Sequence, residues 1–173
     1  MSDTLTAAKV LDAIAAKYNT SVLLRELVLA DPAHNALVDE WLAAGGPDSS
    51  IPFPAGACRR IDALMLEGGT RRTAIEVKVS RSDFLRETPE KRAVWESVTD
   101  RFVYACPSGL IQPGEIPPHC GLWWIGPDQS VTVKSRARKN RTVQPLPHQI
   151  TVTLAYRLKN AQTALRRSTR LSA

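Results

Sequence analysis

The sequence lacks several features that would place the protein in a specialised class. Its three cysteines, Cys58, Cys106 and Cys120, include no Cys-x-x-Cys pair, which argues against a disulfide framework or a four-ligand zinc site and predicts free thiols. No apolar run approaches the roughly 18 to 20 residues that span a membrane. The N-terminal segment has early acidic residues instead of the apolar block of a secretory signal. These absences predict a cytoplasmic protein with no membrane partner.

Acidic residues are missing from the C-terminal quarter of the chain. Residues 1–50 carry 3 basic and 7 acidic side chains, residues 51–133 carry 10 of each, and residues 134–173 carry 10 basic side chains and no acidic one. The net charge of +6 therefore comes from the C-terminal segment. Such a segment suits a phosphate backbone, although the same charge is compatible with a solvated tail that only maintains solubility.

Hydrophobic periodicity predicts an α+β fold for this chain of 173 residues. Helices are expected over residues 4–18, 33–44 and 89–98 and again after Pro147; strands are expected over residues 21–29, 59–67, 72–80, 100–106, 121–125 and 130–134. The order α-β-(α)-β-β-α-β, with extra C-terminal strands and a helix, predicts a mixed β-sheet flanked by helices. We expect residues 1–145 to form one domain, with residues 146–173 as a basic helix that packs on it or extends it. An apolar stripe is expected on this helix, formed by Ile150, Leu154, Leu158, Ala161 and Leu165.

Two acidic residues and a lysine fall on neighbouring strands of an expected hairpin, whose glycine-bearing turn is at residues 68–69. Glu76 and Lys78 are two residues apart and share one face, and Asp62 on the preceding strand comes within cross-strand reach. Neighbouring carboxylates repel unless a cation such as Mg²⁺ or Mn²⁺ joins them. A lysine beside that cation can orient or deprotonate water, or stabilise charge on a phosphate. The alternative is a surface ion pair between Glu76 and Lys78 with no catalytic role.

The spacing Asp62, thirteen residues, then Glu76-Val77-Lys78 resembles the signature of the PD-(D/E)XK nuclease superfamily. Within it, the segments RRIDAL (59–64), IEVKVSRSDFLRE (75–87) and RFVYACPSGLI to GLWWI (101–125) are similar to the MmcB-like DNA-repair proteins and related phage proteins. The resemblance covers residues 21–134. It implies a restriction-endonuclease-like core and a Mg²⁺- or Mn²⁺-dependent deoxyribonuclease of DNA repair, recombination or phage DNA processing. Ile61 stands where the superfamily's name has proline, a position that varies widely.

The resemblance also implies roles for individual residues. Asp62 and Glu76 would ligate the metal, with the Val77 carbonyl as a third ligand, and Lys78 would be the catalytic lysine. A further catalytic acid is common earlier in such chains: Glu26 matches best, and its alternative is an exposed strand acid with no such role. Asp12 is a weaker candidate for the same position. A homodimer is also expected, because many relatives pair to cut two strands.

Several further residues are expected to contact DNA. Arg60 shares a face with Asp62. Ser80 and Arg81 follow the Lys78 strand and open a short helix, capped by Ser80 or Ser82, whose first turn suits a phosphate. Five cations are expected to follow the DNA backbone if they lie beside the site: Lys134, Arg136, Arg138, Lys139 and Arg141. Two alternatives stay open, a non-catalytic nucleic-acid-binding protein on the same fold and an interaction module of a larger nucleic-acid machine.

Overall fold

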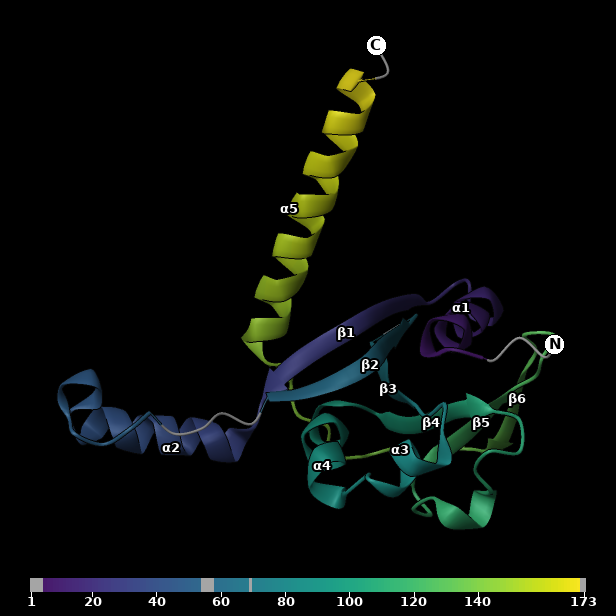
Figure 1. The fold of residues 1–173 in the computed structure, drawn as a ribbon, viewed down its shortest axis with the longest axis horizontal. Helices are drawn as coiled ribbons and strands as arrows, with labels where there is room; N and C mark the ends of the chain where they lie inside the picture. The colour runs from purple at the N-terminus through teal and green to yellow at the C-terminus, as the bar shows by residue number, and fades with distance from the viewer. Residues whose placement is uncertain (1–4, 54–57, 69, 172–173) are drawn as a thin grey trace.

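A computed structural model describes residues 5–53, 58–68 and 70–171. The chain forms an α+β fold around a six-stranded sheet in which the strands follow sequence order (Figure 1). Strands β3, β4 and β5 run parallel, and the other neighbouring pairs are antiparallel. The strands are β1 (Val22–Ala30), β2 (Cys58–Glu67), β3 (Arg71–Val77), β4 (Arg101–Pro107), β5 (Gly121–Ile125) and β6 (Val131–Ser135).

The helices confirm the expected order of elements and the mixed sheet flanked by helices. They are α1 (Ala7–Lys17), α2 (Pro32–Ala43), α3 (Arg81–Leu85), α4 (Pro89–Val98) and α5 (His148–Leu171), with short 3₁₀ turns η1 (Gly46–Asp48) and η2 (Pro113–Glu115). Helix α1 begins later than expected because the Thr6 hydroxyl accepts the N–H of Lys9; residue 4 and Gly69 of the hairpin turn lie outside the described residues. In the described ranges, no helix has the length and apolar character required to cross a membrane.

Two apolar layers enclose the sheet. Helix α1 packs on one face against β3, β4 and β6, and helix α4 packs on the other against β2 and β4. The alternation expected for β3 is confirmed, because Ile75 and Val77 lie in the α1 layer and Ala74 lies in the α4 layer. Trp95 is 1% exposed and its indole N–H donates to the Arg59 carbonyl at 3.0 Å, so α4 is fixed on β2.

The alternation of side chains between the two faces of the sheet shifts by one residue halfway along strands β1 and β2. On β2, Ala63 packs in the α1 layer, whereas Ile61, two residues earlier, packs in the α4 layer. Glu26 lies at the same level of β1 and has a φ of +50°. Strict alternation would keep Ile61 and Ala63 on one face, so a local irregularity twists both strands. Pairing between β2 and β3 ends at Ala63 and Ile75, and Asp62 therefore lies where β2 separates from β3.

Among the residues that the structure describes, helix α5 docks on the domain near its beginning. Ile150 is 1% exposed and Leu154 packs partly against the α4 layer. The apolar stripe expected from the sequence continues along the helix, but Leu158 and Leu165 are 61% and 69% exposed. Figure 1 shows the helix projecting away from the sheet. The leucines of the stripe beyond Leu154 are therefore not part of the two apolar layers among the described residues.

The three cysteines are free thiols, as expected, but they lie in different environments. Cys106 and Cys120 are fully buried and Cys58 is exposed at the beginning of β2. Burial raises the pKa of Cys106 to about 11. Burial, together with the negative charge of Glu96, raises the pKa of Cys120 to about 12. Both buried thiols are thus protonated and unreactive at neutral pH.

We predict that Leu122→Ala lowers the free energy of unfolding by about 2–5 kcal/mol, because Leu122 is fully buried in the α4 layer. The matched control is Leu85→Ala, whose side chain is 69% exposed and which should change stability by less than about 0.5 kcal/mol. Urea denaturation followed by circular dichroism measures both. Equal losses in the two variants would contradict the described core.

Candidate active site

The structure brings Asp62, Glu76 and Lys78 together at the C-terminal end of β3. Glu76 Oε1 lies 2.9 Å from Lys78 Nζ. Asp62 Oδ2 accepts the backbone N–H of Val77 at 2.7 Å. One step beyond the last β2–β3 pair, the register places Asp62 opposite Glu76. The expected convergence of the two acids and the lysine is therefore present, on the face of the sheet that carries α3 and α4.

The carboxylate of Asp62 takes the place of a backbone acceptor where β2 leaves β3. Val77 directs its N–H to Asp62, while the next N–H, that of Lys78, donates to the Ala105 carbonyl of β4 at 2.9 Å. In an extended strand the N–H and C=O of one residue point to the same side. The Val77 carbonyl is therefore directed to the edge of β3 on which Asp62 lies.

Lys78 is buried among acids. Its side chain is 6% exposed, and its Nζ lies 2.9 Å from Glu76, 2.8 Å from Glu87 and 3.9 Å from Asp83. Glu87 is itself 8% exposed and follows α3 in the chain. Sequence reasoning missed Glu87 because only the turn made by α3 brings it back to the strand. Together with Asp62, these acids outnumber the single buried ammonium.

Burial and mutual repulsion shift the titration of this group. Burial, followed by the charge of Asp62, raises the pKa of Glu76 to about 7, although Lys78 partly opposes the shift. Burial also raises the pKa of Asp62, against the opposing effects of the Val77 N–H and Lys78. For Lys78, burial alone would lower the pKa, but Glu76 and Glu87 raise it above its ordinary value. Lys78 is therefore a fixed cation at neutral pH.

A cavity of about 180 Å³ lies next to Glu76 and Glu87. Two exposed cations, Arg60 and Lys91, line it together with Trp95 and Phe102. The charge of Arg60 lowers the pKa of Asp62, so the two side chains are near each other; that they share a face of the sheet stays a prediction, because β2 changes face between Ile61 and Ala63. Lys91 was not expected from the sequence. It comes from the first turns of α4 and its Nζ donates to the Arg86 carbonyl at 2.7 Å.

Ser80 and Arg81 are already engaged within the chain. Ser80 caps α3 as expected, and its hydroxyl accepts the N–H of Asp83 at 3.2 Å. The guanidinium of Arg81 contacts both carboxylate oxygens of Glu115 and donates to the Leu110 carbonyl at 3.3 Å. These contacts fix α3 to the loop between β4 and β5, and they leave neither group directed to a phosphate beside Glu76.

The C-terminal cations do not lie beside the acids. The chain after β6 returns past the beginning of β4, where Asn140 N–H donates to the Asp100 carbonyl at 2.8 Å. Because β3 and β4 are parallel, the beginning of β4 lies at one end of these strands and Glu76 lies toward the other end. Lys134 lies on β6 with its Nζ 4.5 Å from the ring centre of Trp124. Five cations were expected to follow the DNA backbone if they lay beside the acidic site. The structure does not place them there: they are Lys134, Arg136, Arg138, Lys139 and Arg141.

The two candidates for a further acid differ in position. Glu26 lies on β1 at the level of Asp62 and is exposed. Asp12 lies on α1, against the opposite face of the sheet, and forms a 2.6 Å ion pair with Arg25. The position of Glu26 keeps it as a candidate, whereas that of Asp12 removes it from the site.

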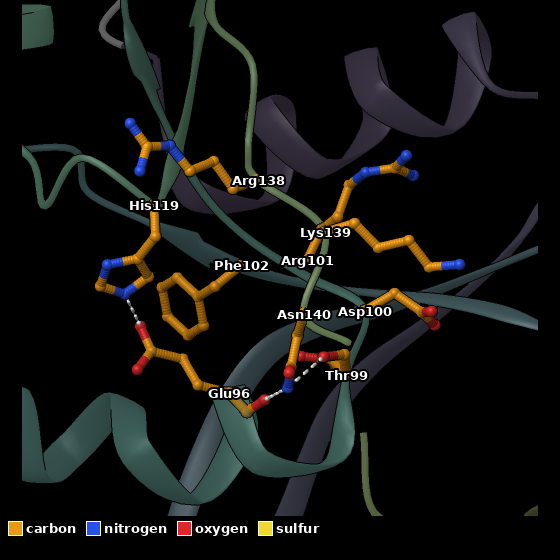
Figure 2. A pocket seen from close by; sticks show the side chains of 9 residues that line it. All are labelled: Glu96, Thr99, Asp100, Arg101, Phe102, His119, Arg138, Lys139 and Asn140. Atoms are coloured by element: carbon orange, nitrogen blue, oxygen red, sulfur yellow. Dashed lines mark hydrogen bonds and ion pairs between the residues drawn. The ribbon is translucent and has the colours of Figure 1, made fainter. Parts of the chain in front are cut away.

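A second cavity, of about 290 Å³, lies beyond Phe102 (Figure 2). Beside it, Glu96 Oε1 lies 2.9 Å from His119 Nε2 and 3.6 Å from Cys120 Sγ; in the described residues these donors form a group within 4.8 Å of one another. The buried guanidinium of Arg92 contacts the same oxygen at 3.3 Å, so a metal cation would meet a fixed positive charge. This group is a hydrogen-bonded network that ties α4 to the β4–β5 loop.

Figure 2 also shows that the cations around this cavity do not converge. The side chains of Arg101, Arg138 and Lys139 point in different directions, while the His119 ring faces Glu96. A phosphate site needs several donors directed to one point. The cavity is therefore a weaker candidate than the one beside Glu76.

Comparison with known proteins supports the fold. No sequence profile of a protein family matches the chain, and no curated protein is significantly similar to it. A solved structure, that of the SPO1766 protein of unknown function from Silicibacter pomeroyi, is similar with a TM-score of 0.55 and 19% identity, over 95% of this chain and 93% of that one. At this identity the similarity concerns the fold alone.

The raised pKa of Glu76 predicts a specific pH dependence of stability. Between the ordinary value of 4.5 and about 7, folded Glu76 keeps a proton that the unfolded chain has lost. The free energy of unfolding should therefore fall as the pH rises through this range. Glu76→Gln should flatten this decline, whereas the control Asp128→Asn, at an exposed turn, should not. Chemical denaturation at several pH values measures the slopes, and a carboxyl NMR titration with a midpoint near 4.5 for Glu76 would contradict the prediction.

Proposed function

We propose that the protein is a metal-dependent nuclease that hydrolyses phosphodiester bonds in DNA, on a sheet of the restriction-endonuclease-like type. The observation that carries the proposal is the pairing of Asp62 with Glu76 beside the buried cation of Lys78. A nucleic-acid-binding surface with no catalytic role has no reason to concentrate carboxylates where phosphates must approach, since like charges repel.

The residues fit a divalent cation. Asp62 and Glu76 supply two carboxylates, and the Val77 carbonyl is directed to the Asp62 side of β3. Oxygen donors of this kind suit Mg²⁺ or Mn²⁺. Without a cation, Glu76 is partly protonated near neutral pH because burial and Asp62 oppose its charge. A bound cation would favour the charged form of both acids. When bound, it would lower the pKa of a coordinated water and offset charge on the scissile phosphate.

Lys78 has a defined part in this proposal. Its raised pKa makes it a poor proton acceptor at neutral pH, so it acts through its positive charge and its N–H donors. Glu76 and Glu87 hold its Nζ in place at 2.9 and 2.8 Å. From there it orients the attacking water or stabilises charge that develops on the phosphate. Glu87 is thus a positioning residue for the lysine.

Arg60 and Lys91 are the residues best placed to hold the DNA backbone. Both line the cavity that contains Glu76 and Glu87, and both are exposed. We assign phosphate contacts to these two side chains in place of Ser80 and Arg81, which do not line this cavity and of which Arg81 is directed to Glu115 and Leu110. Contacts of this kind give affinity without sequence preference.

Metal-dependent cleavage tests the proposal. The chain should cut labelled DNA with Mg²⁺ or Mn²⁺ and not with EDTA, and the substrates should include single-stranded, duplex and branched forms. Asp62→Asn and Glu76→Gln should lower the rate at least about 100-fold, because each removes a charged ligand. Lys78→Gln should do the same, through loss of charge stabilisation.

Asp128→Asn serves as the control for removal of a carboxylate, since Asp128 is an exposed acid in the β5–β6 turn and should leave the rate unchanged. Circular dichroism checks that each variant is folded. Calorimetric titration with Mn²⁺ separates the alternatives: DNA binding with neither cleavage nor Mn²⁺ binding would sink the nuclease proposal and leave a non-catalytic nucleic-acid-binding protein.

Although the C-terminal cations do not lie beside the acids, we propose that they contact DNA farther along its backbone, so that they affect binding and not chemistry. Lys139 and Arg141 follow β6 near the beginning of β4, at the end of the parallel strands opposite Glu76. The double variant Lys139→Ala/Arg141→Ala should therefore weaken DNA binding with little change in the cleavage rate at saturating DNA. The slope of log K against log salt should become shallower by about 0.9 for each lost phosphate contact. A lower rate at saturating DNA would place these residues at the site after all.

A further inference from the structure

The exposed part of helix α5 gains little stability from packing within the described residues. Every residue from 155 to 167 is exposed, including Tyr156 at 62% and Leu158 at 61%. Isolated helices shorter than about 12–15 residues are marginal in water, and most helix stability in proteins comes from packing of an apolar face. Near the base of the helix, Arg157 donates to the carbonyls of Arg25 and Glu26 at 2.6 and 2.7 Å. A second surface that covers Tyr156 and Leu158 would therefore stabilise the exposed part.

Helix α2 presents an apolar cavity that no part of α5 fills within the described residues. A cavity of about 340 Å³ lies between α2 and the segment that follows η1, lined by Leu37, Glu40, Trp41, Ala44, Ile51 and Pro52. The cavity wall is held in place, because the Trp41 indole N–H donates to the Ile51 carbonyl at 2.8 Å and its ring packs edge-on against Phe53. Leu37 and Leu42 are 51% and 55% exposed. Exposed apolar surfaces of this kind mark interaction sites.

The charges of the two helices are complementary. Between Arg25 and Arg59 the sequence has no lysine or arginine, and the α2 region carries Asp39, Glu40 and Asp48. Helix α5 has no acidic residue and five basic ones, Arg157, Lys159, Arg166, Arg167 and Arg170. Attraction between oppositely charged surfaces favours this pairing and disfavours pairing of α5 with another α5.

A single chain does not make this contact in the structure. Figure 1 shows α2 and α5 leaving the sheet in different directions, with their free ends far apart. A second copy related by a two-fold axis resolves this, because α5 of each copy can then pack on α2 of the other. Such an interface is isologous and forms two identical contacts at once.

We infer that the chain forms a homodimer in which the exposed part of α5, with Tyr156 and Leu158, docks on the apolar cavity of α2 in a second copy. The acids of α2 face the cations of α5 across this contact. The occupant is a second copy and not DNA, because apolar side chains interrupt the cations of α5 and match the cavity. The inference does not rest on the proposed nuclease function.

Light scattering on the full chain tests the assembly. The mass should be twice 19.0 kDa at a protein concentration of about 100 µM, and should fall toward the monomer on dilution or in high salt. Leu158→Glu and Leu37→Glu should each raise the dissociation constant at least about tenfold. Leu85→Glu is the matched control, since Leu85 is 69% exposed on α3 and should have no effect.

Cross-linking tests the pairing of the helices. In a Cys58→Ser background, a copy with Ala44→Cys should form a disulfide with a copy that carries Leu158→Cys. A disulfide formed only between two Leu158→Cys copies would overturn the inference in favour of α5–α5 pairing. A monomeric mass at all concentrations would overturn it outright, and a monomer that binds duplex DNA through α5 would assign the helix to nucleic acid. These outcomes are independent of cleavage.

Discussion

The hydrogen bond from the Val77 N–H to the Asp62 carboxylate lies where two strands of the sheet part. A backbone N–H buried without an acceptor is costly, and β2 can leave β3 at this point because a side chain supplies the acceptor. The separation opens space beside Glu76 for the cavity that Arg60 lines. The same carboxylate is thus both a structural acceptor and a candidate ligand, so the site and the shape of the sheet depend on one residue.

The charge balance around Lys78 determines what the site can do. One buried ammonium contacts Glu76 and Glu87 and lies near Asp83, and Asp62 adds a further acid nearby. Removal of one partner from such a group leaves buried charge uncompensated. The excess of carboxylates keeps Lys78 protonated. In the proposed function the same excess favours a cation from solution, and the lysine acts as a charge and not as a base.

The sequence predicted those features of the fold and site that depend on local periodicity. The strand alternation at Ile75 and Val77, the cap at Ser80 and the hairpin register that aligns Asp62 with Glu76 are all local or near-local. Features that depend on long-range packing were not visible. Glu87 reaches Lys78 only through the turn of α3, and the C-terminal cations reach the far end of the parallel strands only because the chain returns past β4. Periodicity also identified the face of α5 but not what it packs against, because the same apolar stripe describes a docked helix and a projecting one.

The distribution of the thiols gives the protein a built-in attachment point for a spectroscopic label. Cys106 and Cys120 are buried and protonated, whereas Cys58 is exposed and lines the cavity that contains Glu76 and Glu87. A maleimide dye would therefore modify one position in the native fold without engineered cysteines. Its emission would report directly on solvent, ions or a bound chain entering the space between β2 and α4.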